Sequence, residues 1–170
     1  MPDYKVVFNS SPIINLYKID KLDLIRQLYG TVYIPFAVFE EIVLSSFEDQ
    51  ANKIKSLVDS GVIKVMNVSN PLLTKTLADK LDKGESEAIV LALEMKADLL
   101  ILDETEARKF ADLYEIHKTG FIGILLSAYK KDLVNDVFAL IQKAIDYGFW
   151  INPVLINELK KTLLNYKKNK

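Results

Sequence analysis

The 170-residue sequence contains no cysteine and a single histidine. The lack of cysteine excludes a disulfide framework, a thiolate zinc site and a cysteine nucleophile. It also fits the reducing cytoplasm, where we expect the protein to act. One histidine, His117, cannot build a zinc site. Ser10 has no histidine nearby in the sequence and no GxSxG context, which argues against a serine hydrolase.

Excess charge and long apolar runs are also missing. The 22 basic and 23 acidic residues nearly cancel, so no general basic field attracts nucleic acid and any such contact has to be local. Basic charge is concentrated only near the C-terminal end, at Lys160, Lys161, Lys167, Lys168 and Lys170, as expected of a solvated helix end. No apolar run approaches the ~20 residues of a membrane span, and no secretory signal is evident.

Half of the residues are apolar, which suffices for one core and predicts a single domain over residues 1–170. Strand-like runs are predicted at 4–8, 31–34, 62–66, 98–102 and 115–117. Helical patterns are predicted at 13–19, 22–28, 35–43, 47–59, 71–81, 85–95, 104–113, 120–131, 134–147 and 153–166. This alternation predicts an α/β domain with a mainly parallel sheet. We expect the helices within about 134–166 to pack on it, with Trp150 between the last two, and residues 167–170 to fray.

Several polar side chains are predicted to meet at one edge of this sheet. Asn9 ends the first strand and Asp103 directly follows residues 98–102, and the carboxyl ends of parallel strands share an edge. Intervening helices could aim Glu41 and either Glu85 or Glu87 at the same place. Crowded carboxylates repel one another, and a hard cation such as Mg²⁺ or Mn²⁺ relieves that repulsion.

Each of these acids also has a purely structural interpretation. Glu85 and Glu87 lie in a predicted first helical turn, where the helix dipole favours acidic residues. Asp103 followed by Glu104 fits a helix N-cap. Glu41 fits a surface residue paired with a lysine. The residue pattern alone therefore leaves the metal site and the structural interpretation open.

Four stretches, taken in order, resemble a known family. They are residues 6–16, 34–42, 83–92 and 99–111, the last continuing through 120–125. Together they resemble the PIN-domain superfamily, in particular a prokaryotic PIN-like branch related to the ribonucleases of toxin–antitoxin pairs. The resemblance implies a three-layer α/β/α sandwich with a small, mainly parallel sheet, and Mg²⁺- or Mn²⁺-dependent cleavage of single-stranded RNA at its carboxyl edge. It also implies a homodimer and a possible antitoxin-like protein partner.

The resemblance assigns expected roles by motif position. Glu41 matches the second family acid and Asp103 the fourth, with Glu104 beside it where many relatives have a second Asp. Glu85 and Glu87 compete for the third position. The expected catalytic residues are Glu41, Glu87 and Asp103. The expected metal ligands are Asn9, Glu41, Glu85, Glu87, Asp103 and Glu104. The expected substrate contacts are Ser10, Ser11 and Arg108.

Asn9 departs from the family pattern, because the first family acid is usually an Asp. An amide oxygen can ligate a hard cation, but it brings no charge and cannot act as a base. Three hypotheses follow. The chain is a metal-dependent ribonuclease weakened at Asn9, an inactive PIN-like module that binds RNA or a protein, or an unrelated α/β protein that binds a nucleotide at the same sheet edge.

Overall fold

The computed structural model describes residues 4–44 and 47–168. Its sheet has five parallel strands in the order β3-β2-β1-β4-β5. The strands are β1 (Val6–Phe8), β2 (Val32–Pro35), β3 (Ile63–Met66), β4 (Leu99–Ile101) and β5 (Lys118–Thr119). The structure therefore confirms the predicted α/β architecture with a parallel sheet.

Helices connect the strands and extend past the last one. In chain order they are α1 (Ser10–Lys18), α2 (Asp23–Tyr29), α3 (Phe36–Leu44), α4 (Glu48–Asp59), α5 (Pro71–Ala78), α6 (Lys83–Met95), α7 (Thr105–Leu113), α8 (Phe121–Lys130), α9 (Val137–Asp146) and α10 (Pro153–Lys168). Along the described chain, no helix is both long and apolar enough to cross a membrane.

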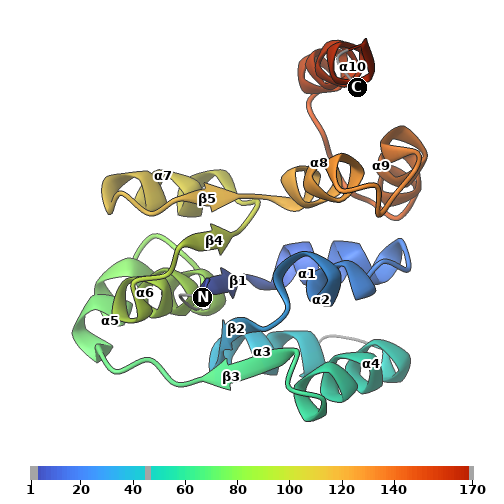
Figure 1. Cartoon of the computed structure of the whole chain (residues 1–170). Helices are drawn as coiled ribbons and strands as arrows, with labels where there is room; N and C mark the ends of the chain where they lie inside the picture. Colours follow the sequence, from blue (N-terminus) through green and yellow to red (C-terminus); the bar gives the residue numbers. More distant parts are fainter. Residues whose placement is uncertain (1–3, 45–46, 169–170) are drawn as a thin grey trace.

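Helices cover both faces of the sheet, because successive strand residues point to opposite sides. Val6 and Phe8 pack into one core with α1, α2, α3 and α8, whereas Val7 packs into a second core with α5, α6 and α7. Figure 1 shows α5, α6 and α7 on one side of the strands, with α1, α2, α4, α8 and α9 on the other. This arrangement is the expected three-layer sandwich.

The strand order places a switch point at the middle of the sheet. The chain builds β1, β2 and β3 toward one edge and then returns to place β4 and β5 on the other side of β1. Open α/β sheets bind ligands at such a point, outside the carboxyl ends of the strands. Asn9 follows β1 and Asp103 follows β4, so both lie at this switch point.

Several predicted boundaries are wrong. The fifth strand is 118–119 rather than 115–117, because Tyr114 to Ile116 close α7: Glu115 has a positive φ, and the Ile116 amide donates back to the carbonyl of Ala111. Pro35 ends β2 instead of opening the next helix. Helix α6 begins at Lys83 rather than Glu85, since Asp82 caps it.

The C-terminal region also differs from expectation in one important detail. Trp150 does not pack between the last two helices; its side chain is 77% exposed. Phe149 is the residue that packs, with its ring 5.0 Å from that of Phe121. Leu159 and Leu163 are buried and anchor α10 on the domain. Helix α10 continues to Lys168, past the predicted end at residue 166, while 169–170 lie outside the described residues.

Candidate functional site

Asn9 and Asp103 lie at the carboxyl ends of neighbouring strands, as the sequence predicted. Phe8 pairs with Ile101 in the parallel ladder, and the backbone amide of Asn9 donates to the carbonyl of Ile101 at 2.9 Å. This hydrogen bond holds Asn9 in place, and its side chain is only 2% exposed. The polar ends of β1 and β4 therefore form the floor of the site.

Asn9 and Ser11 both bind Glu104. The Nδ2 of Asn9 donates to Oε2 of Glu104 at 3.2 Å, and the hydroxyl of Ser11 donates to Oε1. Glu104 is the residue that precedes α7, and its side chain makes no capping hydrogen bond to that helix. The carboxylate is thus directed toward β1 rather than along its own helix.

Asp103 is held at the start of α8. Its Oδ1 accepts a hydrogen bond from the backbone amide of Phe121 at 2.9 Å, which supplies the cap that Gly120 lacks. Gly120 allows this contact, since a Cβ there would lie 2.3 Å from Asp103 Oδ1. Arg108 lies on the same wall and donates from Nη1 to the carbonyl of Leu102 at 2.9 Å.

Two buried oxygen atoms at this edge have no hydrogen-bond partner among the described residues. They are Oδ1 of Asn9 and Oδ2 of Asp103. A buried, unpaired polar atom is costly and uncommon in folded proteins, so each one calls for a physical reason. Both atoms carry lone pairs and lie at the ends of adjacent strands, so each could accept a hydrogen bond from water or coordinate a cation.

Glu41 and Glu85 approach the same edge from α3 and α6. The carboxylate of Glu41 lies over Gly84, where a Cβ would be only 2.9 Å from its Oε2. Glu85 is 8% exposed and forms a capping box with Asp82: its side chain accepts from the amide of Asp82 at 3.0 Å, and its own amide donates to Asp82 Oδ1 at 2.7 Å.

The acids of this edge perturb one another. Burial raises the pKa of Asp103 to about 6, and the neighbouring charge of Glu104 adds to that rise. Burial is also the main cause of the raised pKa values of Glu41 and Glu85, while a hydrogen bond from Ser10 partly offsets the rise at Glu41. Glu104 contributes to the raised pKa of all three. Glu104 is therefore the charge that connects Asp103 with the two glutamates.

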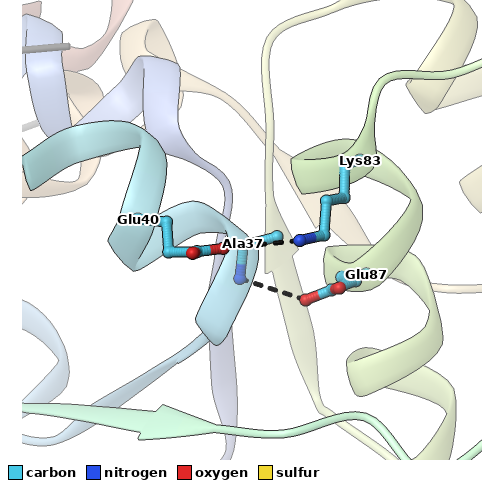
Figure 2. A network of polar contacts seen from close by, with 4 residues as sticks. All are labelled: Ala37, Glu40, Lys83 and Glu87. Atoms are coloured by element: carbon cyan, nitrogen blue, oxygen red, sulfur yellow. Dashed lines mark hydrogen bonds and ion pairs between the residues drawn. The ribbon is translucent and has the colours of Figure 1, made fainter. Parts of the chain in front are cut away.

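Glu87 does not join this group. It points away from Glu85 because two residues correspond to about 200° around a helix. Its carboxylate accepts a hydrogen bond from the backbone amide of Ala37 at 3.1 Å, at the start of α3 (Figure 2). The nearby ion pair of Lys83 and Glu40, at 3.4 Å, is largely exposed. Glu87 thus has a clear structural role in holding α3 against α6.

Asp82 belongs to the edge although it was not among the predicted site residues. Its charge raises the pKa of both Glu41 and Glu85, and its side chain caps α6. The pattern Asp82-x-x-Glu85 is a capping-box signature, and it could have marked this position from the sequence. Across residues 4–44 and 47–168, no three acidic or histidine side chains converge closely enough to enclose one metal ion.

The site can be compared with known protein families. A comparison with curated proteins found no match. A family profile described as a PIN domain matches residues 5–164, which include every residue of this site. The chain therefore belongs to the PIN-domain family.

Proposed function

We propose that this protein is a metal-dependent endoribonuclease that hydrolyses single-stranded RNA at the carboxyl edge of its sheet. The PIN fold implies a nuclease-like architecture in general. The observation that carries the finer proposal is the pair of buried oxygens without partners, Asn9 Oδ1 and Asp103 Oδ2, next to acids that already repel one another. Such an arrangement is destabilising on its own, and a bound divalent cation would relieve it.

The donor atoms fit a hard cation. All of them are oxygens, which suits Mg²⁺ or Mn²⁺. Mg²⁺ keeps several waters and commonly uses only one or two protein carboxylates, so the site does not require three converging acids. Asp103 and Asn9 would hold the ion directly, and Glu104, Glu41 and Glu85 would hold it through water.

The chain's own residues prepare this edge for phosphodiester hydrolysis. A bound divalent cation would supply a nucleophile from water and stabilise charge on the phosphate. The amide of Phe121 fixes the Asp103 carboxylate, and Ser11 and Asn9 fix that of Glu104. Arg108 offers guanidinium donors on the same wall for the incoming phosphate.

The test is cleavage of labelled single-stranded RNAs in Mn²⁺, Mg²⁺ or EDTA. We expect Mn²⁺-dependent cleavage that is lost in Asp103→Asn and increases in Asn9→Asp, which adds the missing charge. The matched control is Glu106→Gln, because Glu106 is an exposed acid on α7 paired with Lys109. Equal cleavage by Asp103→Asn and the natural protein, or cleavage that persists in EDTA, would contradict the proposal.

A second candidate is a PIN-like module that binds RNA or a protein partner without cutting. The observation that favours it is the occupied state of Glu104, which already accepts hydrogen bonds from Asn9 and Ser11. These two hydrogen bonds partly satisfy the Glu104 carboxylate, so less of its charge is left to bind a cation. Cleavage by Asn9→Asp but not by the natural protein would select this candidate.

A further inference from the structure

A cavity of about 440 Å³ opens beside Asp103. It forms where the start of α7, the turn between β5 and α8, and the segment between α9 and α10 meet. Its lining includes Asp103, Arg108, Gly120, Trp150 and Asn152. The cavity thus joins one of the site acids and a guanidinium to the only tryptophan of the chain.

Trp150 is exposed although the residues on both sides of it are anchored. Phe149 packs edge-on against Phe121 at 5.0 Å, and Ile151 is buried. The backbone around Trp150 is therefore fixed while its indole faces the solvent and the cavity. A large aromatic side chain that is held in place but left uncovered offers a stacking surface at low conformational cost.

Arg108 completes the polar side of the cavity. Its Nη1 hydrogen bond to Leu102 orients the guanidinium plane beside Gly120, whose added Cβ would lie 3.3 Å from Nη1. A guanidinium has five donors in a rigid fork, so the group retains donors for a phosphate. The wall therefore pairs a stacking face with an anion-binding group, which together match a nucleotide of a single strand.

We propose that this cavity binds a nucleotide adjacent to the scissile phosphate, with its base against Trp150 and its phosphate at Arg108. The inference rests on the proposed function in taking single-stranded RNA as the ligand, and it names where that strand lies. Bases in a duplex are already stacked and paired, so the cavity selects unpaired strands. The strand would run from the end of β4 across α8 toward the start of α10.

The test measures binding rather than cleavage, in EDTA. A labelled single-stranded RNA of about eight nucleotides, a length that one small domain can cover, is titrated with the protein and followed by fluorescence anisotropy. We expect Trp150→Ala to weaken RNA binding roughly 5- to 150-fold, because the loss of stacking on one base weakens binding by about that factor. Trp150→Phe keeps an aromatic ring and should weaken binding less. The matched control is Tyr147→Ala, an exposed aromatic residue that lines a different cavity with Tyr17 and Lys143.

A second readout needs no variant. Since Trp150 is the only tryptophan, its fluorescence should be quenched by the single-stranded RNA and remain unchanged with an RNA of the same length that lacks bases. Unaltered RNA affinity in Trp150→Ala, absence of RNA binding, or equal quenching by the abasic strand would each overturn the inference. Trp150-dependent binding without cleavage by any variant would support the cavity assignment and overturn the nuclease proposal, so the two failures are distinguishable.

Discussion

The raised pKa of Asp103 predicts an unusual dependence of stability on pH. Its pKa is about 6 in the folded protein against an ordinary value of 3.8, a difference of about 2 units. At 1.36 kcal/mol per unit, this amounts to about 3 kcal/mol. Because the folded state holds the proton more tightly, the contribution is fully present below about pH 4 and is lost as the pH rises through about 6.

Asp103→Asn isolates this contribution. The amide oxygen of Asn can still accept from Phe121, but the side chain no longer ionises. We expect the free energy of unfolding of the variant, relative to the natural protein, to rise by about 3 kcal/mol between about pH 4 and pH 7 in EDTA. The raised pKa values of Glu41 and Glu85 act in the same direction in both proteins, so they largely cancel in this difference.

The assay is urea unfolding followed by circular dichroism across this pH range. The control is Asp59→Asn, an exposed acid at the end of α4 near the opposite edge of the sheet, whose difference from the natural protein should stay constant with pH. Mn²⁺ added near pH 7 should stabilise the natural protein and leave Asp103→Asn unchanged. Parallel pH curves for Asp103→Asn and the natural protein would refute the raised pKa of the buried Asp103 carboxylate.

Three further changes probe the same edge. Asn9→Asp should lower the free energy of unfolding in EDTA by about 1.5–3 kcal/mol, because a hydrogen-bond donor to Glu104 is replaced by a like charge. Mn²⁺ should restore more stability to Asn9→Asp than to the control Asn135→Asp, which changes an exposed residue. Glu87→Ala should lower the free energy of unfolding by about 1–2 kcal/mol, because the hydrogen bond from the Ala37 amide is lost. The variant should keep metal-dependent cleavage. A complete loss of cleavage with an unchanged melting temperature would contradict the structural role of Glu87. Gly120→Ala has room only if Asp103 moves, so it should abolish cleavage and remove the pH effect described above.

The sequence predicted the parallel sheet well because its signals are local. Residues 99–102 form an apolar run typical of a strand covered on both faces, and the polar residues that follow β1 and β4 mark the carboxyl edge. Strand length was less predictable. β5 contains only two residues, and its position depends on how α7 ends. Glu115 takes a positive φ there, and the amides of Glu115 and Ile116 donate to the carbonyls of Asp112 and Ala111, so the helix ends without the glycine that usually marks such an end in a sequence.

The choice between Glu85 and Glu87 could not be made from the sequence. Both lie near the start of α6, and the helix dipole favours an acid at either position. The structure separates them because the first turn of α3 presents an unsatisfied amide at Ala37, which Glu87 accepts. The exposure of Trp150 was also not predicted, because its hydrophobicity favours burial. In the structure Phe149 packs against Phe121 instead, and Trp150 stays exposed.

The hydrogen bonds that Glu104 accepts explain how the edge tolerates its charge without a cation. It is the one acid whose charge raises the pKa values of Asp103, Glu41 and Glu85 together, and both of its oxygens accept hydrogen bonds from the β1 end. An aspartate in place of Asn9 would remove one of these donors and add a charge, so the edge would depend more strongly on a bound metal. Under the proposed function, Asn9 would therefore exchange metal affinity for stability of the metal-free fold, and this exchange would separate an active nuclease from a binding module of the same architecture.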